Sequence, residues 1–474
     1  MADEIPDEIQ RQLTKYGQEH VLRRWNELTE SEREGLAEQI RSLDLGQIAS
    51  LVETARRSKQ GAAENDALIE RAGRARPPSP IVRLPKTADE RNQWEQARQR
   101  GEELLRSGTV GAILVAGGQG TRLGFDKPKG MYPIGVVSGA PLFQVLAEQV
   151  LARSRRAGCA IPYFIMTSDA THDETIAFFL EHDFFGLPPD DIYFFAQGNM
   201  PAVDAESGKL LFSSKATLST SPDGHGGMLR ALARTGLLKE MRRRGIEFLH
   251  YHQVDNPTAI VCDPVFLGFH VGLDCEMSVK VVAKRSAEER TGVAVEIDGK
   301  TQIIEYSDMP AAVARKTEPG GSLLLWAGST AIHVFSRRFL ERILQSETSL
   351  PFHVAHKKVP YCDEQDQLVT PAAENAYKFE RFIFDTLPLA ERTLVLETDR
   401  ACEFNPVKNA TGDDSPESAR SAMVRLHRGW LQEAGARVDP ATPVEISPLF
   451  ALDADEVRAK VQPGTPFTAP TLLK

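Results

Sequence analysis

The amino-acid sequence predicts an α/β protein built on a mostly parallel central sheet. The stretch from Val110 to Ala116 contains no charged residue, which is typical of a strand buried inside a parallel sheet. It runs into a loop with four glycines, and α/β proteins hold nucleotides in such loops at the carboxyl ends of their strands. Strand-like and helical segments then alternate along the chain. The sequence therefore predicts a Rossmann-like sheet, with a helical N-terminal arm and a small C-terminal domain.

The N-terminal arm is predicted to be helical from about Pro6 to Arg57. Apolar residues recur at helical spacing in this stretch, and Thr29-x-x-Glu32 resembles a capping box. The spaced apolar residues are Leu22, Trp25 and Leu28. The stretch from Arg71 to Pro85 is rich in proline and arginine and is predicted to be an extended linker. Residues 1–86 are therefore assigned to the arm and linker.

The catalytic domain is predicted to span residues 87–392. Its alternating pattern predicts strands at 110–116, 161–166, 192–195 and 248–254, and helices at 141–156, 176–180 and 227–238. The pattern then changes to alternating strands at 279–283, 293–297 and 302–306, with a hairpin turn at Asp298-Gly299. We expect this antiparallel insertion to close over one side of the site.

The last segment, residues 393–474, is predicted to be a small C-terminal domain. It begins with a strand at 394–397, followed by a polar loop and a helix from Pro416 to Glu433. From Ala434 onward there are few helix signals and several prolines.

Composition limits the class of protein. A chain of 474 residues is too long for one ordinary core, and 56 basic against 66 acidic residues give a net charge of −10. That balance disfavours a nucleic-acid partner, because a duplex binder needs a basic face. The five cysteines form no C-x-x-C pair, so neither a zinc ribbon nor a disulfide framework is indicated. The acidic, polar start and the lack of a long apolar run predict a cytoplasmic protein with no membrane partner.

The glycine-rich loop does not match two common phosphate-binding templates. Leu123 stands where G-x-G-x-x-G requires its third glycine, and no Gly-Lys-Ser/Thr is present in the loop. The alternative is a flexible connection between a strand and a helix. Glycines nevertheless let main-chain N–H groups approach a phosphate, and the basic residues supply charge for a polyanion. The residues concerned are Gly117, Gly118, Gly120, Gly124, Arg122, Lys127 and Lys129.

The full string around this loop is more specific than its glycines. LVAGGQGTRLGFDKPKGMYPIG resembles the signature of the eukaryotic-type UDP-sugar pyrophosphorylase family, closest to its UDP-N-acetylglucosamine pyrophosphorylases. Later stretches resemble further blocks of that family, in the family's order. They are SPDGHGGMLRAL (221–232), HYHQVDNPTA (250–259), GVAVEIDGKTQIIEYSDM (292–309), YKFERFIFD (377–385) and CEFNPVKNATGDDSPESAR (402–420).

The resemblance implies a uridylyltransferase that joins UTP and N-acetylglucosamine 1-phosphate, giving UDP-N-acetylglucosamine and pyrophosphate. In such a reaction the sugar phosphate attacks the α-phosphorus, and the protein positions the groups and neutralises charge with the help of Mg²⁺. The partners expected are UTP and a sugar 1-phosphate, with no nucleic acid, and the chain is expected to be a monomer or weak homo-oligomer. The alternatives are the same reaction on glucose 1-phosphate or another hexose 1-phosphate, and a non-catalytic nucleotide sensor.

The resemblance also assigns the nucleotide and metal site. It implies that Arg122 clamps the leaving pyrophosphate, and that Asp255 binds Mg²⁺. Asp255 follows a predicted strand, so it should lie at a carboxyl strand end; its alternative role is to cap the helix near Pro264. The nucleotide-binding residues implied are Ala116, Gly117, Gly118, Lys129, Gln197, Gly224, Asp255 and Lys378, and the catalytic residues are Arg122, Lys129 and Lys408.

The sugar-binding residues implied are His225, Glu305, Tyr306, Ser329 and Lys408. Two of them depart from the family pattern. The acetylglucosamine enzymes carry asparagine where this chain has His225, and they carry an A-G-N stretch where it reads Ala327-Gly328-Ser329. The G-H-G string is closer to relatives of the UDP-glucose type.

A metal hydrolase is a further alternative. His250 and His252 would lie on one face of a strand, as in H-x-H metal sites. No additional histidine or aspartate with recognisable spacing supports such a site.

Overall fold

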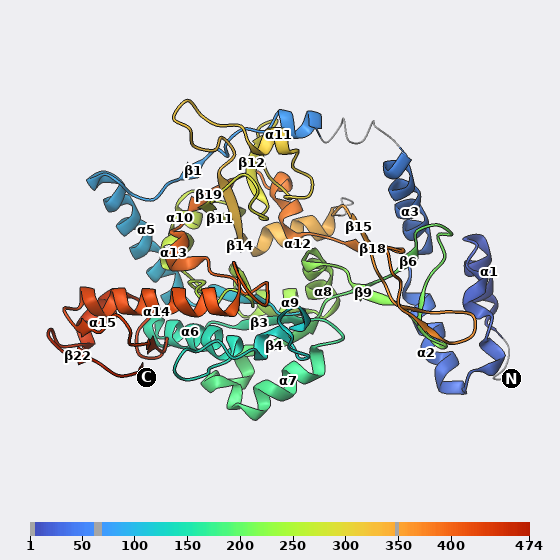
Figure 1. Ribbon diagram of the computed structural model, residues 1–474, viewed down its shortest axis with the longest axis horizontal. Helices are drawn as coiled ribbons and strands as arrows, with labels where there is room; N and C mark the ends of the chain where they lie inside the picture. Colours follow the sequence, from blue (N-terminus) through green and yellow to red (C-terminus); the bar gives the residue numbers. More distant parts are fainter. Residues whose placement is uncertain (1–4, 61–68, 347–349) are drawn as a thin grey trace. The chain divides into compact units, whose positions relative to one another are not determined.

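The computed structural model describes residues 5–60, 69–346 and 350–474 (Figure 1). It contains two compact units. The smaller unit comprises the described residues within Met1–Glu70, Gln197–Met228 and Leu350–Asp385, and the larger unit those within Arg71–Ala196, Leu229–Ser349 and Thr386–Lys474. The three-domain division expected from the sequence stays a prediction.

The larger unit is organised around a mixed, mostly parallel sheet with the strand order β1-β19-β11-β14-β10-β2-β3-β4. β14 (Ala327–Ser336) is antiparallel to both of its neighbours, whereas the other pairs along this order are parallel. The α/β class with a mostly parallel sheet is confirmed. The remaining strands are β1 (Ile81–Val82), β2 (Val110–Val115), β3 (Tyr163–Thr167), β4 (Ile192–Ala196), β10 (Phe248–Gln253), β11 (Met277–Ala283) and β19 (Thr393–Glu397).

The register of β2 and β10 places two important loops at one edge of the sheet. All six residues of β2 are buried, as its lack of charge predicts. β10 runs parallel to it, with Phe248 opposite Val110 and Gln253 opposite Val115. The two strands therefore end level with each other, so that the glycine loop and the Asp255 segment leave the sheet side by side.

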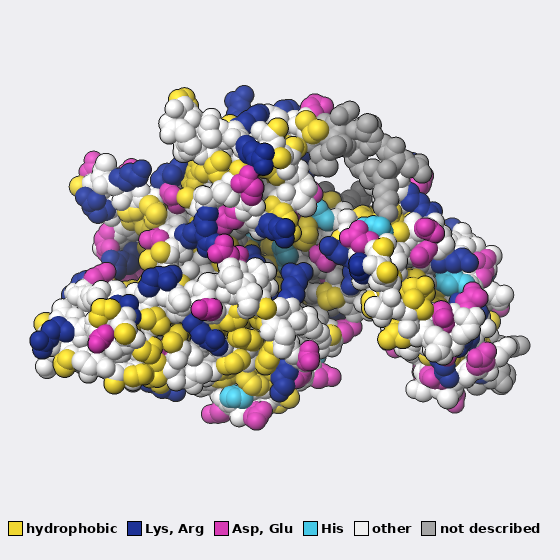
Figure 2. Space-filling view, viewed as in Figure 1, with side chains coloured by type: hydrophobic (Ala, Val, Ile, Leu, Met, Phe, Trp, Pro, Cys, Tyr) yellow, Lys and Arg dark blue, Asp and Glu magenta, His cyan; other side chains and the backbone are white. Residues whose placement is uncertain are grey.

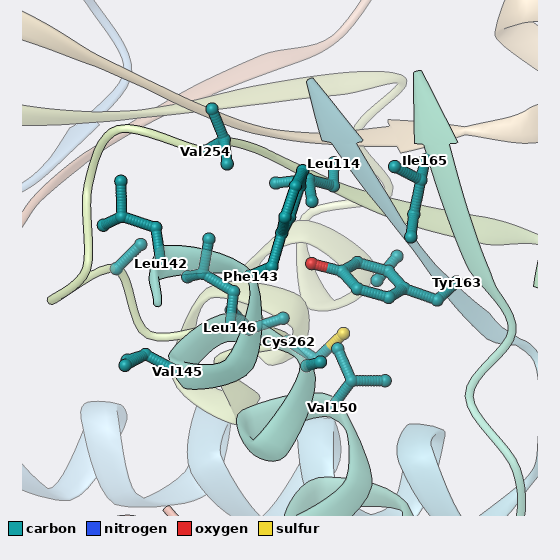
Figure 3. Packing of buried hydrophobic residues seen from close by; sticks show 14 of the residues in the cluster. Leu114, Leu142, Phe143, Val145, Leu146, Val150, Tyr163, Ile165, Val254 and Cys262 are labelled. Atoms are coloured by element: carbon teal, nitrogen blue, oxygen red, sulfur yellow. The ribbon is translucent and has the colours of Figure 1, made fainter. Parts of the chain in front are cut away.

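Helix α6 (Leu142–Ala157) covers β2 and β3. It is bounded by Pro141 at its N-cap and by Gly158, whose φ of 74° ends the helix in the left-handed region. The apolar face of α6 packs on the sheet in the main hydrophobic core (Figure 3). This face carries Leu142, Phe143, Val145, Leu146 and Val150, and it meets Leu114, Tyr163, Ile165, Val254 and Cys262.

Two glycines allow α5 (Ala88–Arg106) and α10 (Pro264–Gly272) to cross at backbone contact. A Cβ on Gly101 would lie 1.8 Å from the carbonyl oxygen of Pro264, and one on Gly268 would lie 1.7 Å from that of Ala97. The other α-helices described after α6 are α7 (His172–Glu181), α8 (Met228–Arg234), α9 (Leu237–Arg243), α11 (Ala311–Ala314), α12 (Arg337–Gln345), α13 (Arg400–Glu403), α14 (Pro416–Glu433) and α15 (Ala454–Lys460).

Several details of the larger unit differ from the sequence prediction. The helix predicted at 227–238 is two helices, α8 and α9, because Gly236 adopts a φ of 75° between them. The predicted linker is extended in part, but it contributes β1 to the sheet edge instead of running free. The hairpin β12 (Val293–Ile297) and β13 (Lys300–Ile304) turns at Asp298-Gly299 as predicted, although its second strand starts two residues earlier.

The end of the chain extends the larger unit with short parallel strand pairs. α14 has the predicted bounds, and its Ala419 and Met423 belong to the main core. Beyond it, β20 (Arg437–Val438) pairs with β22 (Pro466–Phe467), and β21 (Val444–Ile446) pairs with β23 (Thr471–Leu473).

The smaller unit packs the N-terminal helices on short antiparallel strands. The helices are α1 (Asp7–Lys15), α2 (Glu30–Ser42) and α3 (Leu45–Gln60), and the capping box of Thr29 and Glu32 is confirmed at α2. The apolar spacing from Leu22 to Leu28 forms two 3₁₀ turns and not a continuous helix. The strands are β5 (Asn199–Pro201), β6 (Val203–Asp204), β7 (Phe212–Ser214), β8 (Thr217–Leu218), β9 (Thr220–Pro222), β15 (His353–Lys357), β16 (Tyr361–Cys362), β17 (Leu368–Val369) and β18 (Ala376–Glu380).

The surface seen in Figure 2 carries charged side chains of both signs. Basic and acidic side chains are interspersed over the face of each unit shown in Figure 2. No helix within the described residues is both long enough and apolar enough to span a bilayer. All five cysteines are free thiols.

Candidate active site

The glycine loop forms a compact turn that leaves its first part open. Lys129 N–H donates to the Gly118 carbonyl at 3.0 Å, and Gly120 N–H donates to that of Lys127 at 2.9 Å. A Cβ on Gly118 would meet no atom within 4 Å, so Gly118 borders open space. By contrast, a Cβ on Gly130 would lie 2.2 Å from the Phe143 ring. The loop therefore needs glycine for packing at one end, and it offers exposed backbone to a ligand at the other.

The predicted metal carboxylate and the predicted UTP lysine lie together beside this loop. Lys129 Nζ is 4.0 Å from Asp255 Oδ2, and the two side chains keep 16% and 19% exposure. Such a pair is accessible yet partly shielded, so its charges act more strongly on a bound phosphate than they would in bulk water. Arg122 lies in the 3₁₀ turn η3 (Thr121–Leu123), where its side chain is exposed. Ala116 is buried, and its N–H donates to the Met166 carbonyl.

Asp255 does not cap the helix that begins at Pro264. The N-cap of α10 is Asp263, whose Oδ1 accepts from the Val265 N–H at 2.9 Å. The capping alternative for Asp255 is therefore wrong, and its carboxylate remains available beside Lys129.

The segment that carries Lys408 is joined to the Asp255 segment by its backbone. The Val407 N–H donates to the Asp255 carbonyl oxygen at 2.7 Å. The Lys408 N–H in turn donates to the Asp414 carbonyl at 2.6 Å, and its half-buried side chain holds Nζ 5.6 Å from the centre of the Phe404 ring. The structure thus brings together three of the predicted residues of the larger unit, namely Lys129, Asp255 and Lys408.

A buried ionic cluster anchors these two segments, and sequence reasoning missed it. Lys280 Nζ, 1% exposed, lies 2.7 Å from Asp263 Oδ2 and 2.5 Å from Glu403 Oε1. Burial disfavours the charged form of Lys280, but the two carboxylates outweigh this effect and raise the pKa of the ammonium group. Burial also raises the pKa of Glu403, although the charge of Lys280 acts to lower it. Asn256 Nδ2 donates to the Glu403 carbonyl at 2.8 Å, which ties the residue after Asp255 to this cluster.

Two predicted sugar residues meet at Gly292. The Ser329 N–H donates to the Gly292 carbonyl at 2.8 Å, and a Cβ on Gly292 would lie 2.7 Å from Glu305 Oε1. Ser329 Oγ accepts from the Ala331 N–H at 3.3 Å, and Ala331 has a φ of 56° within β14. Tyr306 is 50% exposed.

The smaller unit holds the predicted uracil residues around one backbone crossing. Gly224 has a φ of 82°, and a Cβ there would lie 2.4 Å from the Arg381 carbonyl oxygen. The Arg381 N–H donates to the Asp223 carbonyl, and the Asp223 N–H donates to that of Gly198. Gln197, which directly precedes Gly198, is buried. Lys378 is half-buried on β18, two residues before Glu380. A Cβ on Gly224 would lie 3.0 Å from the Cβ of Glu380.

His225 is held as a neutral imidazole in this crossing. Its Nδ1 accepts from the Ile383 N–H at 3.1 Å, and its ring stacks on Phe382 with centroids 5.3 Å apart. Burial lowers its pKa to about 4, with nearby His353 as a further cause. Because Nδ1 accepts, the ring proton resides on Nε2. An asparagine has no ring to stack on Phe382. The histidine that replaces the asparagine of the acetylglucosamine pattern therefore packs on a local partner.

His250 and His252 do not form a metal centre with other described residues. Both are fully buried on β10, and no group of three or more His, Cys, Asp or Glu side chains suited to a metal exists within the part of the chain that the structure describes. Burial, followed by His252 and the cation Lys280, lowers the pKa of His250, while burial lowers that of His252 to about 3. These two histidines therefore lack a third metal ligand among the described residues, and the hydrolase alternative loses its support.

Comparison with known proteins agrees with this geometry. The profile of the family described as UTP--glucose-1-phosphate uridylyltransferase matches residues 79–462. The chain belongs to this family. Among curated relatives, the human UDP-N-acetylhexosamine pyrophosphorylase-like protein 1 is 37% identical over 506 aligned positions, which cover 100% of this chain and 97% of the relative. The Saccharomyces cerevisiae UDP-N-acetylglucosamine pyrophosphorylase is 40% identical over 357 positions, covering 73% and 75% of the two chains.

Solved structures show the same family likeness in three dimensions. The Trypanosoma brucei uridine diphosphate N-acetylglucosamine pyrophosphorylase, crystallised with an inhibitor, is similar with a TM-score of 0.80 and 26% identity. The match covers 95% of this chain and 93% of that one. The family resemblance read from the sequence motifs is therefore confirmed over nearly the whole chain.

Proposed function

We propose that this protein is a uridylyltransferase that joins UTP and N-acetylglucosamine 1-phosphate, releasing pyrophosphate. The observation that carries the proposal is the pair of Lys129 and Asp255, 4.0 Å apart beside a glycine loop with open backbone. Phosphoryl-type transfer requires this combination of cationic, amide and carboxylate groups, and it needs no nucleophile on the protein.

Each charged group then has a defined task in binding and turnover. Lys129 and the loop N–H groups bind the phosphates of UTP, Arg122 neutralises the leaving pyrophosphate, and Lys408 orients the sugar phosphate for in-line attack. In the smaller unit, Gln197 and Gly224 recognise uracil and Lys378 binds phosphate oxygens. The contribution of these residues is positioning and charge neutralisation.

The residues fit a Mg²⁺ cofactor bound through Asp255. Mg²⁺ is typically held by one or two carboxylates, with substrate phosphates and water completing an octahedron. A single half-shielded carboxylate beside Lys129 has that character. When bound, Mg²⁺ would supply charge neutralisation at the α-phosphate.

N-acetylglucosamine 1-phosphate is the preferred sugar substrate because several relatives carry that activity in their names. Glucose 1-phosphate or another hexose 1-phosphate is the second candidate, favoured by His225 and Ser329 where the acetylglucosamine enzymes have asparagine. Glu305, Tyr306 and Ser329 are proposed as the sugar contacts. We further propose that the enzyme acts in the cytoplasm as a monomer or weak homo-oligomer.

An assay with purified protein tests the proposal. UTP and Mg²⁺ are incubated with N-acetylglucosamine, N-acetylgalactosamine, glucose or galactose 1-phosphate, and pyrophosphate release is followed. Turnover should be highest with N-acetylglucosamine 1-phosphate. Higher turnover with glucose 1-phosphate would establish the second candidate, whereas UTP binding without turnover on any sugar would indicate a nucleotide sensor.

A further inference from the structure

A cavity of about 610 Å³ lies in the larger unit and is lined by none of the residues proposed above to contact nucleotide or sugar. Cavities of this size commonly accept small organic ligands. Residues of α5, α6, α14, β21 and β23 line it. Its apolar wall includes Val145, Met423, Trp430, Ile446, Ala451 and Leu472.

The lining of this cavity includes a buried arginine with an unsatisfied donor. Arg153, on α6, is 4% exposed, and its Nε has no hydrogen-bond partner among the described residues. Burial lowers the pKa of its guanidinium, against the opposing charge of Asp263. Leaving a buried donor unsatisfied is costly, so each such group in a native protein calls for an explanation.

The acidic groups around the cavity are already matched by other partners. Glu148 accepts from Gln144 at 2.8 Å and from Ser447 at 2.6 Å. Asp263 forms its ion pair with Lys280 at 2.7 Å. Glu445 accepts from the Val137 and Ser138 N–H groups. The other acids of the lining form ion pairs with arginines: Asp453 and Glu102 with Arg156, and Glu95 with Arg98. These acids therefore have partners of their own, whereas Arg153 keeps a donor that lacks an acceptor among the described residues.

We propose that the cavity is a second ligand site, which binds a small amphipathic carboxylate with its acid group on Arg153 and its apolar body on the wall. A guanidinium recognises a carboxylate through two parallel hydrogen bonds. A carboxylate suits the site better than a phosphate, because Glu148 and Glu445 in the same lining would repel a doubly charged group more strongly.

The site touches the loop that follows Asp255. Pro257 and Ile260 both line the cavity. Thr258, also in the lining, donates from Oγ1 to Asn256 Oδ1 at 3.1 Å. A ligand in the cavity thus contacts the segment that begins at the proposed metal carboxylate, without occupying the substrate site.

Calorimetric titration of the full chain with 4-phenylbutyrate tests the proposal, without UTP or sugar phosphate. We expect saturable binding to one site, weakened at least about tenfold in Arg153→Met and unchanged in Arg155→Met. Arg155 is the matched control because it is an exposed arginine on the same helix. The neutral amide 4-phenylbutanamide should bind the wild-type protein at least about tenfold more weakly than the acid.

The proposal would be overturned by no binding to the wild-type protein at about 10 mM probe, by equal binding of acid and amide, or by displacement of the probe by saturating UTP. Equal binding to wild type and Arg153→Met would also overturn it. The melting temperature of Arg153→Met should match or exceed that of the wild type, since an unpaired buried charge is removed. Should that variant unfold, the acid–amide comparison on the wild-type chain decides. The readout is binding, so it does not depend on the uridylyl transfer proposed above.

Discussion

The Val407 N–H donates to the carbonyl oxygen of Asp255 at 2.7 Å. This bond joins the segment after β10 to the loop that carries Lys408. It fixes the backbone at Asp255 and at the residue before Lys408. The carboxylate of Asp255 and the ammonium of Lys408 are therefore positioned by shared main-chain geometry, so a substitution of either side chain leaves that geometry in place. The site can be dissected one side chain at a time.

Asp255→Asn should reduce kcat by at least about 100-fold, because the amide keeps the shape of the side chain but loses the charge that holds Mg²⁺. The hydrogen bond between Val407 and Asp255 joins backbone atoms, so the substitution keeps it. The free energy of unfolding should therefore stay within about 0.5 kcal/mol of that of the wild type. Steady-state pyrophosphate release over a Mg²⁺ series measures the first effect, and chemical denaturation measures the second. Near-normal turnover would remove Asp255 from the metal site.

Lys408→Ala should lower kcat/KM for the sugar 1-phosphate by about 10- to 100-fold, through a higher KM or a lower kcat. UTP binding should be nearly intact, since this lysine is assigned to the second substrate. Lys239→Ala, which removes an exposed lysine of α9, serves as the control for loss of charge. Titration of UTP beside steady-state kinetics separates the two effects, and unchanged kinetics would exclude Lys408 from the site.

Lys280→Met should destabilise the protein by about 3–5 kcal/mol, because it leaves Asp263 and Glu403 buried without a cation. The same change should loosen the Asn256 anchor and lower kcat. Adding Glu403→Gln to Lys280→Met should recover part of the stability, since one buried charge is then removed. Urea denaturation of the single and double variants measures this coupling. A single variant as stable as wild type would show that the cluster carries no net stabilisation.

Local sequence patterns predicted much of the fold correctly because they depend on neighbouring residues. The uncharged run at Val110 made β2 recognisable as a buried strand, and α14 has the bounds predicted for it. The split between α8 and α9 was missed because a glycine inside a helical pattern can continue the helix or end it. The edge strand β1 was missed because two residues among prolines carry no periodicity.

The motif residues of the site could be predicted from the sequence, but the buried residues that hold them in place could not. Asp255 and Lys129 belong to recognisable strings, and the register of β2 and β10 brings those strings together. Lys280 lies within a strand that has no other charged residue, and this isolated lysine was the available signal of a buried ionic partner. Nothing local marks Glu403 as that partner, because it is 123 residues away and the contact depends on strand order.

Gly224→Ala should destabilise the protein by at least about 2 kcal/mol, because its φ of 82° disfavours a side chain and the new Cβ would lie 2.4 Å from the Arg381 carbonyl. Gly429→Ala is the matched comparison. Gly429 lies inside α14, and a Cβ there would meet no atom within 4 Å, so alanine should stabilise the helix by up to about 1 kcal/mol. Denaturant titration of both variants measures the contrast. Equal effects at the two positions would contradict the backbone described for Gly224.

Stability should fall on acidification below about pH 6.5 because buried histidines must be neutral in the fold. Burial lowers the pKa of His252 and His270 to about 3 and that of His427 to about 4, from 6.5 when unfolded. A pKa lowered by folding gives stability that is fully present above 6.5 and is lost as the pH falls toward the folded value. His252→Phe keeps a ring next to Tyr163, with which His252 stacks, but removes one titrating group.

The difference in unfolding free energy between wild type and His252→Phe should therefore change by about 2 kcal/mol, in favour of the variant, between pH 6.5 and pH 5.0. Urea denaturation at pH 8.0, 6.5, 5.5 and 5.0 measures this difference. At pH 8.0 the comparison reports packing and the lost hydrogen bond between His252 Nε2 and the Tyr163 hydroxyl, because the imidazole is neutral in both folded and unfolded chains. A constant difference across the series would mean that His252 is protonated as easily in the fold as in the unfolded chain, and that β10 admits water at this position.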